Sequence, residues 1–289
     1  MLTRRVLIAS GLAVMAAPAF AAAPFANCVA DIEARLGGRI GATWLGPGGG
    51  TWTGYRQEER FLMGSTFKTF LVAATLQRAR SNAFDLSDVV AFTEADLVPN
   101  SPVLKARLVE GEGAVSRDAL CEAAITASDN TAANLLLRDL GGPEALTRFM
   151  RRLGDGTSRM DRMEWAPNDR VSACHPRDTS TPLAFARSLR KVLFGGGIAP
   201  ADGRRLANLM RKCRNLPNRI RAGVPKDWDV GVKPGDNGAE GGAFTDVGFF
   251  KRDGGRMQML AVFIEARAAG AEACETAIAS IARIVATRA

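Results

Sequence analysis

Short strand-like segments lie near both ends of this chain and leave a long helical stretch between them. Residues 39–45 and 51–57 flank the run Gly46-Pro-Gly-Gly-Gly50, which predicts a β-hairpin. A hairpin alone is only marginally stable in water, so it needs partner strands. Those partners appear only near the far end, where three segments alternate or run apolar: 228–233, 244–252 and 257–266. One sheet must therefore be assembled from both ends of the chain.

The middle of the chain, roughly residues 66–210, predicts mostly helix. Apolar residues recur there at helical spacing in four segments, 67–79, 117–127, 131–140 and 143–153. Segments 26–36 and 270–288 predict helices that bracket the strands. We therefore expect an α+β fold: an antiparallel sheet of about five strands packed with terminal helices, and an inserted all-helical subdomain. The active site is expected in the cleft between the two parts.

The first residues predict an export signal. Arg4 and Arg5 precede an apolar run from Val6 to about Phe20, which ends in the small residues around Ala21. We therefore expect residues 1–21 to be a signal peptide, residues 22–289 to form a single domain, and the protein to be periplasmic. The general secretory route is favoured, although the arginine pair leaves twin-arginine export open. No later segment has the roughly 18 uninterrupted apolar residues of a membrane span, so no membrane association is expected.

Charge and cysteine content narrow the partners. The net charge of +8 becomes 8 − 2 = +6 when Arg4 and Arg5 leave with the signal, and the basic residues are dispersed with few aromatic neighbours. A nucleic-acid groove is therefore not expected. One histidine and scattered cysteines show no ligand spacing, so we expect neither metal nor cofactor, and nothing requires an oligomer. Five cysteines allow at most two disulfides, and Cys28 with Cys274 is the pairing to test, because terminal helices often pack together.

Polar motifs carry the chemistry, in a fixed order along the chain: Ser65-Thr-Phe-Lys68, Ser128-Asp-Asn130, Glu164 and Lys233-Pro-Gly235. Ser65 and Lys68 are three residues apart at a helix start, which puts them on one face near free backbone N–H groups. A serine hydroxyl needs a base before it is a good nucleophile. The only histidine, His175, lies in the irregular segment 155–182, so lysine or glutamate must be that base. Long loops of this kind usually serve function, and 155–182 is a candidate wall of the site.

The motifs closely resemble those of class A serine β-lactamases in order and spacing. Three runs carry the resemblance, 61–68, 128–143 and 162–168, and it extends over essentially the whole mature chain. It implies a β-lactam hydrolase that works through an acyl-enzyme on Ser65, and hence antibiotic resistance. It also implies an α/β part at about 22–64 and 211–289, a helical part at about 65–210, and an Ω-loop at about 159–182.

The resemblance assigns the chemical roles by position. Ser65 is the acylated nucleophile, Lys68 is its proton partner, and Ser128 passes a proton to the β-lactam nitrogen. Glu164 and Asn168 position the hydrolytic water. Whether Lys68 or Glu164 is the base in acylation stays open, whereas the glutamate's part in deacylation is accepted for the family.

The resemblance also assigns the binding roles. Asn130 holds the side-chain amide of the substrate, and Lys233 attracts the substrate carboxylate and tunes Ser128. The backbone N–H groups of Ser65 and Asp236 form the oxyanion hole, and Gly235 is a further substrate-binding residue. Two further assignments concern charged side chains: Arg219 matches an arginine that some members use for the substrate carboxylate, and Arg162 with Asp178 matches the ion pair that closes the Ω-loop.

Several positions depart from the family pattern, and three of them concern substrate binding. Pro234 replaces a serine or threonine whose hydroxyl contacts the substrate carboxylate, and proline in a strand fits an edge position. Asp236 stands where a small or hydroxyl residue is usual, and its charge is expected to repel an anionic substrate. Asn100 replaces an aromatic residue at the mouth of the site, so less stacking is expected. The alternatives are a D,D-peptidase, against which Glu164 and Asn168 in a long loop argue, and a penicillin-binding sensor that stays acylated.

Overall fold

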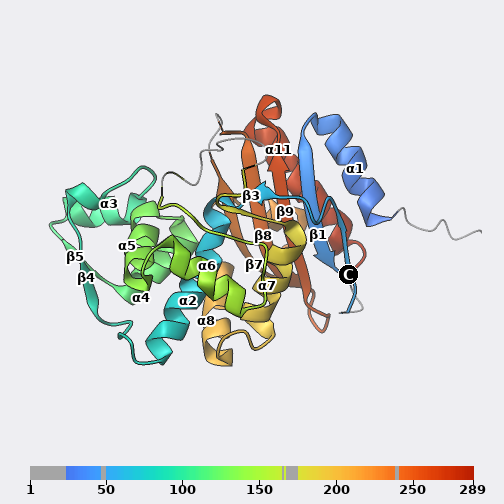
Figure 1. Ribbon diagram of the computed structural model, residues 1–289. Coiled ribbons are helices and arrows are strands. Elements are labelled where there is room, and N and C mark those ends of the chain that lie inside the picture. Colours follow the sequence, from blue (N-terminus) through green and yellow to red (C-terminus); the bar gives the residue numbers. More distant parts are fainter. Residues whose placement is uncertain (1–23, 47–49, 165, 167–174, 238–240) are drawn as a thin grey trace, which may run out of the picture.

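The computed structural model describes residues 24–46, 50–164, 166, 175–237 and 241–289. The predicted signal peptide, residues 1–21, lies outside this range. Within it, a five-stranded sheet with its covering helices lies beside a helical part (Figure 1). None of the helices in the described ranges has the length and apolar character needed to cross a membrane.

The sheet is built from both ends of the chain, as predicted. Its strand order is β2-β1-β9-β8-β7, and every neighbouring pair is antiparallel. The strands are β1 (Arg39–Leu45), β2 (Trp52–Tyr55), β7 (Asp229–Asp236), β8 (Ala243–Lys251) and β9 (Gln258–Glu265). Two short strand pairs were not predicted, β3 (Phe61–Leu62) with β6 (Thr179–Ser180) and β4 (Val89–Ala91) with β5 (Ala114–Ser116).

Helices cover both faces of the sheet. One face packs against α1 (Phe25–Leu36), α9 (Ile220–Gly223) and α11 (Gly270–Ala286). The other face packs against α7 (Pro182–Phe194), which joins the sheet to the helical part. That part also contains α2 (Lys68–Arg80), α3 (Pro102–Val109), α4 (Arg117–Glu122), α5 (Asn130–Leu140), α6 (Pro143–Arg152) and α8 (Pro200–Lys212). The predicted α+β architecture is confirmed.

Strand β7 lies at one edge of the sheet and carries the Lys233 motif. It extends to Asp236, whereas the predicted strand ended at residue 233. Pro234 pairs only with Asp246 on β8, so the N–H that proline lacks is not needed by a second strand. A Cβ at Gly235 would lie 2.7 Å from the backbone nitrogen of Ser65, so glycine is required for this approach. The predicted site therefore lies where β7 meets the start of α2.

The predicted disulfide between Cys28 and Cys274 is wrong. Helices α1 and α11 do pack together, but the start of α1 lies at the end of α11, where Arg288 Nη2 is 3.4 Å from Cys28 Sγ. Cys274 lies 288 − 274 = 14 residues earlier, in the first turns of α11. That separation is about 20 Å along the helix axis. Because a disulfide needs Cα atoms within about 7 Å, the two thiols cannot meet.

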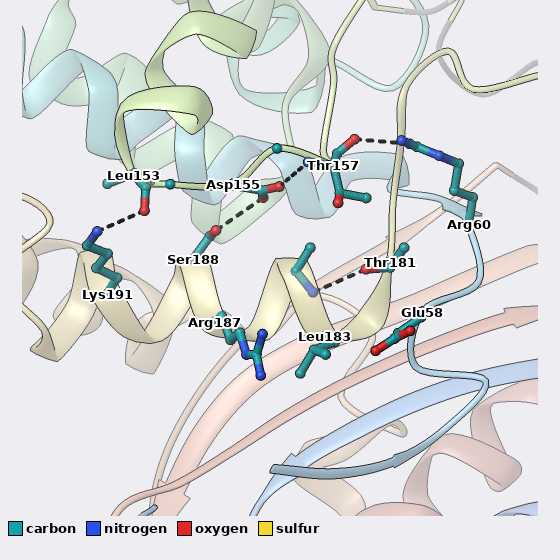
Figure 2. Close-up of a pocket in the computed structure, with 13 residues that line it drawn as sticks. Glu58, Arg60, Leu153, Asp155, Thr157, Thr181, Leu183, Arg187, Ser188 and Lys191 are labelled. Atoms are coloured by element: carbon teal, nitrogen blue, oxygen red, sulfur yellow. Dashed lines mark hydrogen bonds between the residues drawn. The ribbon is translucent and has the colours of Figure 1, made fainter. Parts of the chain in front are cut away.

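The irregular loop leaves the helical part at an anchored point beside a hollow of about 670 Å³ (Figure 2). The buried carboxylate of Asp155 accepts hydrogen bonds from the backbone of Thr157 and Ser158, each at 2.8 Å. Ser188 on α7 donates to the same carboxylate at 3.1 Å. Arg60 donates to the carbonyl of Thr157 at 3.0 Å. These contacts fix one end of the loop against α7.

Candidate active site

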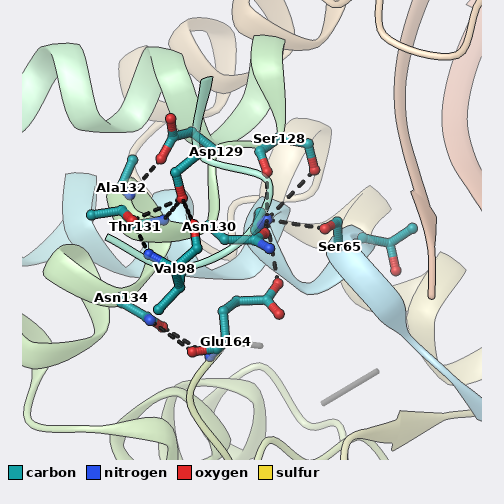
Figure 3. Close-up of polar contacts among 12 residues, drawn as sticks. Ser65, Val98, Ser128, Asp129, Asn130, Thr131, Ala132, Asn134 and Glu164 are labelled. Carbon is teal, nitrogen blue, oxygen red and sulfur yellow. Dashed lines mark hydrogen bonds and ion pairs between the residues drawn. The ribbon is translucent and has the colours of Figure 1, made fainter. Parts of the chain in front are cut away.

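Ser65 and Lys68 form the centre of the predicted site. A 3₁₀ turn, Gly64–Phe67, leads directly into α2, so Ser65 lies at the start of a helix and Lys68 is the first residue of α2. Ser65 is buried and Lys68 is wholly buried. Lys68 Nζ lies 3.0 Å from Ser65 Oγ, which is within reach for transfer of the hydroxyl proton. Figure 3 shows Ser65, Ser128 and Glu164 arranged around this point.

Oxygen atoms surround the Lys68 amine. Besides Ser65, its Nζ contacts the carbonyl of Ser128 at 2.8 Å, Oδ1 of Asn130 at 2.5 Å and Oε1 of Glu164 at 3.3 Å. Burial lowers the pKa of Lys68, and the Glu164 carboxylate opposes this shift. A lysine balanced between these effects can exchange a proton with the hydroxyl and the carboxylate that it touches.

Asn134 on α5 holds Glu164 in place within the irregular loop. Its Nδ2 donates to the carbonyl of Glu164 at 2.8 Å, and its Oδ1 accepts from the Glu164 N–H at 2.8 Å. The two bonds fix the backbone and leave the carboxylate to face Lys68. Sequence reasoning gave Asn134 no role. The signal that could have found it is its spacing, four residues after Asn130 on one helix face.

Ser128 adopts a left-handed backbone conformation between a π-helix, Ala123–Ala127, and α5. Its φ of 58° is uncommon for a serine, and it directs the carbonyl oxygen and the hydroxyl towards two lysines. Lys233 Nζ lies 3.0 Å from Ser128 Oγ, and Lys68 Nζ lies 3.5 Å from it. Burial lowers the pKa of Lys233 to about 7. A hydroxyl between two such amines is well placed to relay a proton.

Asn130 and Asn100 meet at the start of α5. The side chain of Asn130 donates from Nδ2 to the carbonyl of Pro99 at 2.9 Å, and its backbone N–H donates to the carbonyl of Asn100 at 3.1 Å. Asn100 is exposed and has a φ of 60°. The side-chain nitrogen of Asn130 carries two N–H groups, and one of them donates to Pro99. The predicted hydrogen bond from Asn130 to a substrate needs only the second.

The predicted ion pair between Arg162 and Asp178 is present at the base of the loop. Arg162 Nε lies 2.6 Å from Asp178 Oδ2. The other oxygen of Asp178 accepts from the backbone N–H groups of Asp161 and Arg162, at 2.8 and 3.1 Å. Asp178 is only 1% exposed, so water replaces none of these contacts. These contacts join residues 161 and 162, which precede Glu164, to residue 178 near the other end of the loop.

Changing Asp178 to asparagine should lower the free energy of unfolding by about 3 kcal/mol, because it removes the buried carboxylate that accepts hydrogen bonds from the Arg162 side chain and from two backbone N–H groups. Urea unfolding measures the change. Asp253→Asn, in the exposed β8–β9 turn, is the matched control and should shift stability by less than about 0.5 kcal/mol. A loss below about 1 kcal/mol for the Asp178 variant, typical of an exposed pair, would contradict the anchoring role.

The end of β7 lies against the start of α2. Gly235 contacts the turn at Ser65, and the backbone nitrogen of Asp236 would lie 3.5 Å from a Cβ built on Gly64. The N–H groups of Ser65 and Asp236 therefore belong to two segments in direct contact. This arrangement is compatible with the oxyanion hole that the resemblance implies, which stays a prediction.

Arg219 is buried beside Asp236, and its predicted contact with a substrate carboxylate stays a prediction. Its side chain is 1% exposed, and it donates to the carbonyls of Gly235 and Thr245 at 2.8 and 3.0 Å. Its Nη2 lies 2.9 Å from Asp236 Oδ2. The guanidinium thus binds the protein itself rather than presenting an open surface to a substrate carboxylate. Asp236, expected as a repelling charge, is paired with this arginine.

One predicted residue cannot be placed. Asn168, expected to position the hydrolytic water, lies outside the described residues, and its role stays a prediction. Within the described part of the chain, no group of three or more His, Cys, Asp or Glu side chains is arranged to hold a metal ion.

A serine hydroxyl in contact with a buried lysine, which in turn contacts a buried carboxylate, defines a serine acyl-transfer enzyme on this α+β scaffold. Residues 24–289 match the model of the β-lactamase enzyme family. The chain belongs to this family, and within it to the class A serine β-lactamases, which hydrolyse β-lactams.

Individual relatives support this assignment over more than nine-tenths of the chain. The carbapenem-hydrolyzing β-lactamase KPC of Klebsiella oxytoca is 38% identical over 92% of this chain and 90% of its own length. β-Lactamase L2 of Stenotrophomonas maltophilia is 38% identical over 96% of this chain and 89% of its own. Among solved structures, an ancestral Gram-negative class A β-lactamase superposes with a TM-score of 0.86 at 38% identity, covering 91% of this chain and 99% of that one.

Proposed function

We propose that this β-lactamase works through an acyl-enzyme on Ser65, which a water activated by Glu164 then hydrolyses. The observation that carries the proposal is the continuous contact from Ser65 Oγ to Lys68 Nζ at 3.0 Å and on to Glu164 Oε1 at 3.3 Å. This contact supplies a nucleophile, a proton acceptor and a second base, all three of which are buried.

In acylation, Ser65 Oγ attacks the β-lactam carbonyl carbon, and its proton passes to Lys68. Charge develops on the carbonyl oxygen, where the N–H groups of Ser65 and Asp236 stabilise it; one such donor is worth about 3 kcal/mol in a comparable enzyme. The C–N bond then breaks. The ring nitrogen takes a proton from Ser128, which regains one from Lys68, so the serine proton ends on the leaving nitrogen.

In deacylation, the Glu164 carboxylate takes a proton from a water, and the oxygen of that water attacks the ester carbon on Ser65. The ester C–O bond breaks, and the serine oxygen recovers its proton from the glutamic acid. The product is the ring-opened acid, and the enzyme returns to its starting state. The clamp by Asn134 supports this role, because it fixes the peptide groups on both sides of the Glu164 Cα.

We also propose that the enzyme acts in the periplasm and confers β-lactam resistance. The charged, apolar and small-residue pattern of residues 1–21 supports export. Expression of the full chain in a susceptible Gram-negative host should raise the inhibitory concentration of a penicillin, and the activity should leave the cells with the periplasmic fraction on osmotic shock. Activity retained in the cytosolic fraction would contradict the proposed location.

The first test of the proposal is hydrolysis of a benzylpenicillin and cephalosporin panel by the mature chain, with intact protein mass taken during turnover. Rapid hydrolysis with little accumulated adduct is expected. A stable adduct on the unmodified protein would instead indicate a penicillin-binding sensor. Absence of both hydrolysis and adduct would overturn the acyl-enzyme mechanism.

A further inference from the structure

Arg219 is a buried cation with two carboxylate partners, and it donates directly to the carbonyl of Gly235. Besides its bonds to two backbone carbonyls, it lies 2.9 Å from Asp236 through Nη2 and 3.3 Å from Glu275 on α11 through Nε. A guanidinium has five N–H donors, and four are used by these contacts. The charge of Arg219 is therefore already matched within the protein.

Asp236 is the most exposed member of this cluster. Its side chain is 32% exposed, compared with 16% for Glu275 and 1% for Arg219. It follows Gly235, which packs directly against the backbone of Ser65. A substrate attached to Ser65 and lying along the end of β7 thus reaches the exposed carboxylate of Asp236 before it reaches the buried guanidinium of Arg219.

The charge at this end of β7 is low for a site that receives an anion. Arg219, Asp236 and Glu275 together carry 1 − 2 = −1. Lys233 adds one positive charge on the Ser128 side, but its pKa is lowered to about 7. A β-lactam carboxylate placed here meets little net attraction. A positive group beside that carboxylate would instead be attracted by the net negative charge of the cluster.

We propose that Asp236 is a specificity-determining residue that makes this enzyme favour β-lactams with a cationic group next to the ring carboxylate. The inference rests on the proposed acyl-enzyme mechanism, since it places the substrate on Ser65. Cephalosporins with a pyridiniomethyl group at C3 are the substrate class with this charge pattern. Their cation lies beside the ring carboxylate, where the exposed edge of Asp236 can pair with it, while Arg219 keeps Asp236 in position.

The test compares two cephalosporins that share one 7-acylamino side chain and differ at C3, where one carries a pyridiniomethyl and the other an acetoxymethyl group. For each enzyme, the selectivity is the ratio of kcat/KM for the first to kcat/KM for the second. Asp236→Asn keeps the size of the side chain and removes its charge. It should lower the ratio about tenfold, through loss of the attraction to the cation and release of Arg219 towards the carboxylate.

Two variants separate charge from structure. Asp236→Glu retains the carboxylate and should keep a ratio closer to that of the unmodified enzyme than Asp236→Asn does. Asp227→Asn makes the same charge change at an exposed position outside the strand and should leave the ratio unchanged. Because both substrates share the same Ser65 chemistry, a purely structural loss would lower both rates and leave their ratio as it was.

The outcomes separate the two proposals. A ratio that falls with Asp236→Asn and not with Asp227→Asn supports the inference. Hydrolysis of both substrates with a ratio that is the same in all variants overturns the specificity role and leaves the mechanism intact. Failure of the unmodified enzyme to hydrolyse either cephalosporin or a penicillin would overturn the proposed mechanism itself.

Discussion

Replacing Ser65 with alanine should lower kcat/KM for penicillins by about a millionfold, as removal of a serine nucleophile does in other acyl-transfer enzymes. The hydroxyl contacts Lys68, and it lies at the helix start beside Gly235. Without the Ser65 hydroxyl, no covalent intermediate forms. Lys68 and Glu164 can then activate only a water molecule. Intact mass should show no adduct at any substrate concentration.

The alanine variant should remain folded, because Ser65 contributes one hydrogen bond to Lys68 and several other acceptors remain around that amine. Ser81→Ala, at the exposed end of α2, is the matched control and should keep full activity. Residual hydrolysis above about one thousandth of the normal rate, more than the oxyanion donors and binding alone supply, would show that another nucleophile carries the reaction.

The architecture could be predicted because its signals are local. Apolar alternation at 228–233 and 257–266 and the glycine-rich turn at 46–50 indicate strands, and strands with no partner nearby must pair across the helical middle. The register could not be predicted in this way. Side-chain packing between distant segments determines that Lys233 opposes Val247 and that β7 extends through Pro234.

The catalytic centre was also accessible from the sequence, because Ser65 and Lys68 are held by one helix start and Ser128 by a neighbouring motif. The surroundings of Arg219 were not. Its partners Asp236 and Glu275 lie 17 and 56 residues away along the chain, and no spacing rule links them. The Cys28–Cys274 pairing failed for a related reason, since helix contact does not fix which ends of two helices meet.

Replacing Glu164 with glutamine should slow deacylation by about a thousandfold, within the range that a general base supplies, while acylation continues. Glutamine keeps the shape of the side chain but cannot take a proton from water. Lys68 loses the carboxylate that opposes the lowering of its pKa, so it is more readily neutral and still accepts the Ser65 proton. The acyl-enzyme should therefore accumulate.

Stopped-flow hydrolysis and intact mass test this expectation on the same samples. The glutamine variant should show a burst of one equivalent of β-lactam ring opening and a protein heavier by the whole mass of the penicillin, because acylation releases no leaving group and the acid is freed only on deacylation. Glu144→Gln, exposed in the first turn of α6, should turn over normally without an adduct. If the Glu164 variant instead lost the burst along with turnover, Glu164 would be required for acylation as well, and the proton of Ser65 would have to reach it through the 3.3 Å contact with Lys68.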